Sequence, residues 1–188
     1  MAKQQISTSL KETYNNEILV NLMKQFNLKN KNQVTKLSKI VINSGIGSAK
    51  DDKKILEVAE NTFLKITGQK PVKQLAKKSI ASFKLREGNV VGLKVTLRND
   101  YMYDFLYRLI HLVLPRLRDF HGISDKAFDK QGNYSLGLHD QTIFPELSFE
   151  ETSVLHGLQI NFVFDHHDIE MNKSLMREFG IPFVKENK

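Results

Sequence analysis

Residues 89–98 read NVVGLKVTLR, and this stretch decides the fold class of the chain. Apolar residues alternate along it with small, polar or basic ones, so the two sets point to opposite sides of an extended backbone. The apolar set is Val91, Leu93, Val95 and Leu97, and the opposite set is Gly92, Lys94, Thr96 and Arg98. This period of two predicts a strand with one buried face and one open face.

Short β-rich runs and longer helical patterns surround this strand. Further strands are expected at 39–43, 71–76, 132–140 and 157–165. Helices are expected from Ser9 to Phe26, from Asp51 to Gly68, over 99–120 with a kink or end at Pro115, and from Asp168 to a stop at Gly180. We therefore predict an α+β fold with an antiparallel-rich sheet of about five strands, helices on one face, and an open, basic face.

The bulk composition is that of an ordinary folded domain. We expect one domain over residues 1–188, with a basic loop protruding at about 76–89. The absence of cysteine excludes thiolate catalysis and disulfides and fits a reducing compartment. The N-terminus lacks the apolar core of a signal peptide, and no run is long enough to span a membrane. We expect a cytoplasmic protein without a membrane partner.

Charge is unevenly distributed along the chain, whose formal net charge is +7. Residues 77–98 carry Lys77, Lys78, Lys84, Arg86, Lys94 and Arg98 against Glu87 alone. Residues 140–170 hold no Lys or Arg but contain Asp140, Glu146, Glu150, Glu151, Asp165, Asp168 and Glu170. This polarity favours one polyanionic partner and one basic partner, although solvated charged faces would give the same pattern.

The open face of the predicted sheet carries cations, amides and hydroxyls. These are the donors that phosphates and riboses need, and few acids are mixed among them. A half-solvated sheet without a ligand remains the alternative interpretation.

Two motifs that resemble catalytic or nucleotide sites do not complete such a site. The stretch NSGIGSAKD (43–51) has Lys50 where a dinucleotide fingerprint needs its third glycine, and it has no phosphate-loop signature. The stretch DHHD (165–168) resembles a metal cluster, but no second Asp/His cluster completes a two-metal site. A polar strand-to-helix junction explains DHHD better. We predict no catalytic residues, no metal and no cofactor.

Two longer motifs resemble a known family. GQKPVKQLAKKSIASFKLREGNVVGLKVTLR (68–98) and LPRLRDFHGISDKAFDKQGNYSLGLHDQTIFPEL (114–147) are similar to the signature segments of the universal large-subunit ribosomal protein five family, of bacterial type. KIVINSGIG and the closing FGIPF extend the resemblance over nearly the whole chain. Ser44, Asn99 and His121 differ from the family pattern, which usually has Met, Gly and Arg there.

The resemblance implies a structural role in the ribosome and no enzyme activity. Members of this family hold 5S ribosomal RNA in the central protuberance of the large subunit, beside neighbouring ribosomal RNA and proteins. A loop between two strands reaches the transfer RNA in the peptidyl site, and another surface contacts small-subunit ribosomal protein thirteen. The resemblance implies that the chain acts as a monomer within the ribosome.

These implied roles divide the candidate residues into three sets. The set expected to bind 5S ribosomal RNA is Lys39, Asn43, Gly45, Phe83, Lys94, Thr96 and Arg98. The set expected to contact transfer RNA is Lys77, Lys78, Ser79 and Ile80 at the loop tip, together with Lys84 and Arg86. The set expected to contact the small-subunit protein is Asp140, Gln141, Phe144, Pro145 and Glu146. Because the loop has little core of its own, we expect it to become ordered when RNA binds.

Two other classes of function remain open at this point. A general RNA-binding module would bind many structured RNAs, whereas a metal-dependent phosphoesterase would take up metal.

Overall fold

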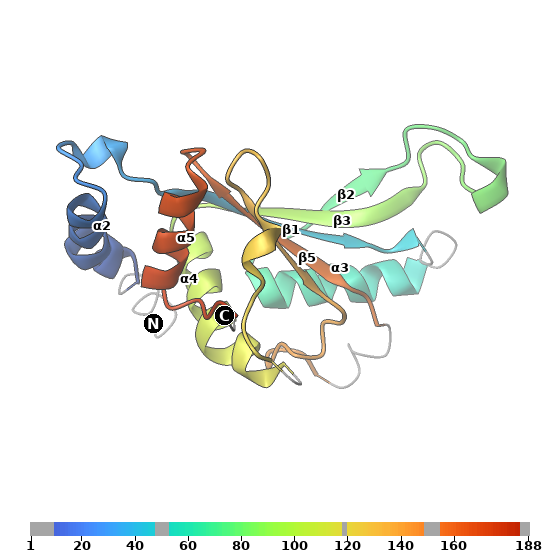
Figure 1. Cartoon of the computed structure of the whole chain (residues 1–188). Coiled ribbons are helices and arrows are strands. Elements are labelled where there is room, and N and C mark those ends of the chain that lie inside the picture. The colour runs from blue at the N-terminus through green and yellow to red at the C-terminus, as the bar shows by residue number, and fades with distance from the viewer. Residues whose placement is uncertain (1–9, 48–52, 118–119, 149–154, 185–188) are drawn as a thin grey trace. The chain divides into compact units, whose positions relative to one another are not determined.

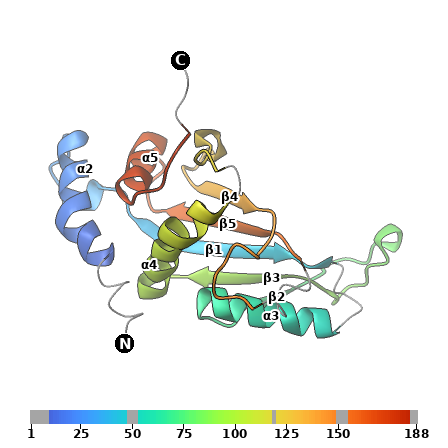
Figure 2. The ribbon, with the colours of Figure 1, turned by 90° about the horizontal axis from the view of Figure 1, so that it is seen from below.

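The computed structural model describes residues 10–47, 53–117, 120–148 and 155–184. They form an α+β fold around a five-stranded sheet with the order β2-β3-β1-β5-β4. The strands are β1 (Leu37–Gly45), β2 (Val72–Leu75), β3 (Val90–Leu97), β4 (Tyr134–Leu138) and β5 (Leu158–Phe164). In Figure 2 the arrow of β1 points opposite to those of its neighbours β3 and β5, and β2 pairs antiparallel with β3, which confirms the predicted fold class.

The helices lie where the hydrophobic periodicity predicts them. They include η1 (Tyr14–Ile18), α2 (Leu19–Gln25), α3 (Lys53–Thr67), α4 (Asn99–Arg108), η5 (Leu109–Val113), η6 (Leu114–Arg116) and α5 (Ile169–Glu178). Short 3₁₀ turns occur at η2 (Lys31–Gln33), η4 (Ala81–Phe83) and η7 (Asp125–Ala127). The helical run ends just after Pro115, as predicted, because Leu117 is already extended. The expected helix starts at Ser9 and Asp51 lie outside the described residues.

The chain divides into two compact units. The first contains residues 1–40, 97–136 and 161–188, and the second contains residues 41–96 and 137–160. The single domain expected from the sequence stays a prediction. Within the described residues, no helix combines the length and apolarity needed to cross a membrane.

In the first unit, helices pack around a core that Ile18, Leu22, Phe105 and Leu175 help to form. Asp168 ends the loop before α5 and accepts hydrogen bonds from the backbone N–H of Glu170 and Met171, so it caps the helix. Asn99, at the start of α4, has a φ of +51°, a left-handed conformation that glycine and asparagine tolerate best.

In the second unit, α3 lies along one face of β1 and β3 (Figure 1). Phe63 and Ile66 of α3 are buried, as are Ile42 of β1 and Leu93 and Val95 of β3. Gly68 follows α3 with a φ of +71°, and its N–H donates to the carbonyl of Leu64, which is the predicted helix stop. The alternate residues of the strands therefore face away from α3.

Candidate nucleic-acid interface

The second unit has an open sheet face, which we define by Asn43, Gly45, Val72, Gln74, Lys94 and Thr96. The strand pairing aligns Val72 with Lys94 and Gln74 with Gly92, so β2 adds two further side chains to this face. Lys94 is exposed and Asn43 and Thr96 are half-buried. Four residues of the predicted 5S RNA set thus lie on one face, together with Val72 and Gln74, which the sequence analysis did not identify. Their contribution depends on the strand register, which the periodicity of one segment does not define.

The opposite face of β2 has a different role. Lys73 points toward α3 and its Nζ lies 2.6 Å from Oε1 of Glu60. Within the described residues, no comparable carboxylate pairs with Lys94. Lys94 on the open sheet face is therefore available to an external anion, whereas Lys73 on the opposite face is neutralised by Glu60.

Gly92 allows β1 and β3 to approach each other closely at this face. A Cβ atom added to Gly92 would lie 2.7 Å from the carbonyl oxygen of Ser44, which is closer than real Cβ atoms come. The N–H of Ile46 also donates to the carbonyl of Val91 at 3.0 Å. The glycine thus lets Asn43 and Lys94 share one surface.

Lys39 and Arg98, also predicted to bind 5S RNA, belong to the first unit. Lys39 is half-buried in β1, and Arg98 is exposed with an extended backbone just before α4. Within the described residues, neither side chain forms an ion pair. Both cations remain candidates for phosphate contacts.

The basic hairpin, residues 76–89, has a defined hydrogen-bonded conformation. At its base the N–H of Ala76 donates to Asn89 O at 2.8 Å, and the N–H of Gly88 donates to Ala76 O at 3.0 Å. Further out, Ile80 and Leu85 exchange two backbone hydrogen bonds, of 2.9 and 3.1 Å. Figure 1 shows this segment extending from β2 and β3. Ordering of the segment when RNA binds stays a prediction.

The tip of the hairpin differs from the predicted one. Because Ile80 pairs with Leu85, the outermost turn is Ala81–Lys84, and Lys77, Lys78 and Ser79 lie on the stem. Phe83, predicted to join the sheet surface near the loop's return, lies in this turn and is 70% exposed. Lys84 follows with a φ of +49°, which turns the chain back toward β3. The prediction was wrong about the tip because the register of the hairpin was not visible in the sequence.

The other hairpin residues have clear positions. Lys77, Lys78 and Arg86 are exposed. The hydroxyl of Ser79 accepts the N–H of Glu87 at 2.9 Å, so Ser79 stabilises the stem. The hairpin therefore combines exposed cations on its stem with an exposed aromatic ring at its tip, an arrangement that suits a nucleic acid.

The acidic turn, residues 140–147, is compact. One carboxylate oxygen of Asp140 accepts the N–H and the hydroxyl of Thr142, at 3.2 and 2.5 Å. Backbone bonds from Phe144 to Gln141 and from Leu147 to Phe144 follow. Pro145 is exposed, and Asp140 and Glu146 are partly exposed, although Oε2 of Glu146 is buried.

Gln141 and Phe144 are placed differently from the prediction. Their exposed fractions are 0% and 3%, so their side chains point into the second unit and cannot form the outer surface of the turn. We therefore regard them as anchors of the turn, whereas Asp140, Pro145 and Glu146 remain candidate contacts.

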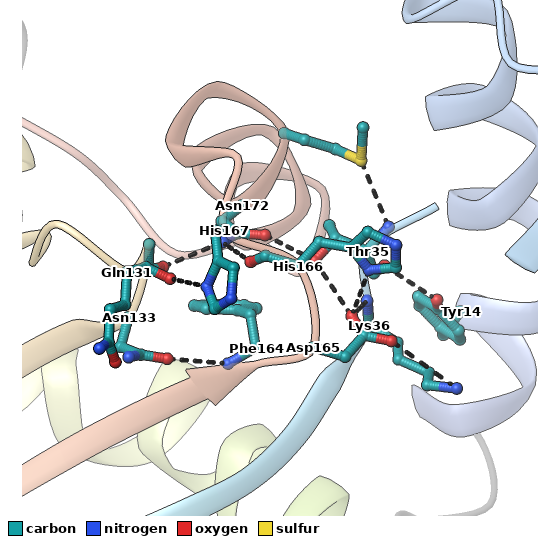
Figure 3. A network of polar contacts seen from close by, with 12 residues as sticks. Tyr14, Thr35, Lys36, Gln131, Asn133, Phe164, Asp165, His166, His167 and Asn172 are labelled. Atoms are coloured by element: carbon teal, nitrogen blue, oxygen red, sulfur yellow. Dashed lines mark hydrogen bonds and ion pairs between the residues drawn. The ribbon is translucent and has the colours of Figure 1, made fainter. Parts of the chain in front are cut away.

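The DHHD stretch forms a polar junction between β5 and α5, as Figure 3 shows. The Asp165 carboxylate accepts the N–H of Lys36 at 2.8 Å and lies 2.9 Å from Nδ1 of His166. His167 Nδ1 lies 2.9 Å from the carbonyl of Gln131, and Asp168 caps α5. These four side chains thus have structural partners, and no group of three or more metal-ligating residues occurs among the described residues.

Comparison with known proteins identifies the family. A family model for the C-terminus of the ribosomal protein L5 family matches residues 90–183, and one described as ribosomal protein L5 matches residues 30–86. The chain belongs to the ribosomal protein L5 family. L5 proteins are structural constituents of the ribosome, so this chain is not an enzyme, and its expected location in the ribosome follows from the family.

Relatives match this L5 chain over nearly its whole length. The large ribosomal subunit protein uL5 of Clostridium kluyveri is 51% identical over 181 residues, covering 96% of this chain and 100% of the relative. The large ribosomal subunit protein uL5c of Gracilaria tenuistipitata is 49% identical over 95% of this chain and 100% of the relative. The large ribosomal subunit protein uL5 of Geotalea uraniireducens is 51% identical over 93% of this chain and 97% of the relative.

Proposed function

We propose that this L5 family member is a constituent of the large ribosomal subunit that binds 5S ribosomal RNA through the open sheet face. Lys94 contacts phosphates, and Asn43 and Thr96 supply hydrogen bonds to riboses or bases. Lys39 and Arg98 of the first unit are additional candidates for phosphate contacts. The observation that carries the proposal is the contrast between Lys73, which is paired with Glu60 of α3, and Lys94, which is exposed on the opposite face without a carboxylate partner among the described residues. The names of the relatives support the assignment to the large subunit.

The basic hairpin contacts the transfer RNA in the peptidyl site. Lys77, Lys78 and Arg86 of the stem attract the phosphate backbone, whereas Phe83 at the tip stacks on a base or packs on a ribose. The 70% exposure of Phe83 supports this role, because it leaves most of the side-chain surface accessible to a nucleotide. We thus assign Phe83 to the transfer RNA set instead of the 5S RNA set.

The outer surface of the acidic turn contacts small-subunit ribosomal protein thirteen and forms a bridge between the subunits. Asp140 and Glu146 supply negative charge for a basic partner, and Pro145 supplies an exposed apolar contact. Neighbouring large-subunit RNA and proteins surround the chain, which acts as a monomer.

A competition titration tests the 5S RNA assignment. In this experiment, binding of labelled 5S ribosomal RNA to the purified protein is measured at several salt concentrations, with transfer RNA as the competitor. The pair Lys94→Ala and Arg98→Ala should weaken binding and lower the salt slope by roughly one ion per lost phosphate contact. The matched pair Lys77→Ala and Lys78→Ala removes the same charge and should preserve binding. Equal losses from the two pairs would refute the division of the basic surface.

The specificity of the wild-type protein decides between this role and a general RNA-binding module. Retained preference for 5S RNA at physiological salt supports recognition by the open sheet face. Equal competition by transfer RNA would show that the free protein is a nonspecific polycation.

Subunit association at low magnesium tests the bridge. Asp140→Lys with Glu146→Lys should weaken association, whereas Glu170→Lys, an exposed reversal on α5, should not. Unchanged association after the double reversal would refute the bridge.

A further inference from the structure

The segment between β4 and β5, residues 139–157, is long for a connection within one sheet. Its described residues, 139–148 and 155–157, contain turns but no helix or strand. Such a segment keeps a defined conformation only where side chains anchor it. Three side chains are buried here, those of Gln141, Phe144 and His156, with exposed fractions of 0%, 3% and 8%.

The hydrogen bonds of His156 define its tautomer. The Oγ of Ser44 lies 2.6 Å from the carbonyl oxygen of Gly157 and 3.1 Å from Nδ1 of His156. A carbonyl oxygen only accepts, so the single hydroxyl proton of Ser44 is donated to Gly157. The Oγ can then contact His156 Nδ1 only as an acceptor, which requires that Nδ1 carries a proton.

The surroundings of the ring exclude a second proton. Among the described residues, the buried Nε2 of His156 has no hydrogen-bond partner, so a proton there would be a buried donor without an acceptor. Burial lowers the pKa of His156, although the Gly157 carbonyl acts in the opposite direction. The ring also stacks on Phe63 of α3, with centroids 6.1 Å apart and planes inclined by 19°. His156 is therefore neutral, with the proton on Nδ1.

Gln141 connects the two ends of the segment. Its Oε1 accepts the backbone N–H of His156 at 2.8 Å. Hydrogen bonds thus run from Gln141 near the start of the segment to His156 near its end, and from His156 to Ser44 in β1.

We propose that Ser44, Gln141 and His156 form a hydrogen-bonded lock that holds the described parts of this segment, residues 139–148 and 155–157, against β1 and sets the position of the acidic turn. They are positioning residues, because their buried side chains cannot reach a partner. With the lock in place, Pro145 is exposed and Asp140 is partly exposed on the outside of the turn. Only the identity of the partner that contacts them rests on the proposed function.

The ring nitrogens of His156 provide the first test. In the full-length protein labelled with ¹⁵N, we expect a protonated, pyrrole-like signal for Nδ1 and an unprotonated, pyridine-like signal for Nε2 at neutral pH. Ser44→Ala removes the hydroxyl that accepts from Nδ1–H and should shift the Nδ1 signal, although the Gly157 carbonyl remains beside the ring. A proton on Nε2 in the wild-type protein, or an unchanged spectrum in Ser44→Ala, would overturn the lock.

Amide hydrogen exchange provides the second test. The amides of Phe144, Leu147 and His156 are hydrogen-bonded and report on the segment. We expect roughly tenfold faster exchange in Ser44→Ala and in His156→Phe, which keeps an aromatic ring on Phe63. The double variant should exchange little faster than either single variant, because both remove the same interaction.

Controls separate the lock from a loss of overall stability. Ser135→Ala removes an exposed serine hydroxyl that donates to Asn161, and it should leave exchange in the segment unchanged. The amide of Ile46, bonded to Val91, reports on the sheet. Equal acceleration at Ile46, or effects of the two variants that multiply, would overturn the proposal.

Binding to small-subunit ribosomal protein thirteen is measured separately. Wild-type protein that shows the expected tautomer and exchange but no binding would refute the partner and leave the lock standing.

Discussion

Asn172 provides the most direct test of how the first unit is stabilised. The residue lies on α5 with 0% exposure, and its side chain satisfies three other groups. Its Oδ1 accepts the hydroxyl of Thr35 at 2.5 Å, and its Nδ2 donates to the carbonyls of Gly132 at 3.0 Å and His166 at 2.8 Å. Figure 3 shows this network. Asn172 therefore joins three segments that are distant in the sequence.

Replacing Asn172 by Leu should strongly destabilise the first unit. The change leaves one hydroxyl and two carbonyl oxygens without their partner, and each such buried group costs about 1–3 kcal/mol. Because the carbonyls can recover part of this cost by relaxation, we expect a loss of about 3–5 kcal/mol in the free energy of unfolding. Proteins of this size are stable by only about 5–15 kcal/mol, so the loss is large.

Urea unfolding followed by circular dichroism measures this loss, and Asn21→Leu is the matched control. Asn21 is exposed on α2 and donates one hydrogen bond, of 3.3 Å, to Glu178. Both substitutions change helix propensity in the same way, so that contribution cancels in the comparison. We expect the control to change stability by less than about 0.5 kcal/mol. A difference between the two variants below about 1 kcal/mol would refute the reasoning from buried hydrogen bonds.

Three further predictions concern stability. Gly92→Ala should lower the free energy of unfolding by about 1–3 kcal/mol, because the new Cβ would meet the Ser44 carbonyl. Gly137→Ala is the control and should be tolerated, because the space around Gly137 is open. Equal urea midpoints for the two variants would contradict this prediction. Asp168→Ala removes the N-cap of α5 and should lower the free energy of unfolding, measured by thermal unfolding, by about 0.5–2 kcal/mol. A smaller loss would mean that the capping hydrogen bonds are not formed in solution. The pKa of His156 is lowered from its ordinary value of 6.5, so its neutral form stabilises the fold above pH 6.5, and this stabilisation is lost as the pH falls from 6.5 through the folded pKa. His156→Phe should remove this part of the pH dependence in urea titrations at several pH values, and an identical pH profile would exclude it.

The strand and helix pattern could be predicted because it depends on local periodicity. The alternation in residues 89–98 corresponds to β3 (Val90–Leu97), with Leu93, Val95 and Leu97 buried and Lys94 exposed. Pro115 and Gly68 end helices for reasons that act within one or two turns, namely a missing N–H and a positive φ. Such effects do not require knowledge of the rest of the fold.

The candidate site was only partly predictable because it depends on pairing and burial. Phe83 lies at the hairpin tip because Ile80 pairs with Leu85, and a pairing one residue away would move every side chain. Gln141 and Phe144 resemble an exposed polar-aromatic loop in sequence, yet both are buried. A single sequence carries no signal that distinguishes an anchoring glutamine from a contact glutamine.

The sequence by itself determined the family, the fold class and the polarity of charge, because each is a property of residue order along the chain. Only the tertiary structure decided that Ser44 meets His156, that Lys73 is neutralised while Lys94 is exposed, and which side of the acidic turn faces outward. The physical reason is that hydrogen bonds and ion pairs between residues distant in the sequence exist only after the sheet register and helix packing bring them within about 3 Å of each other.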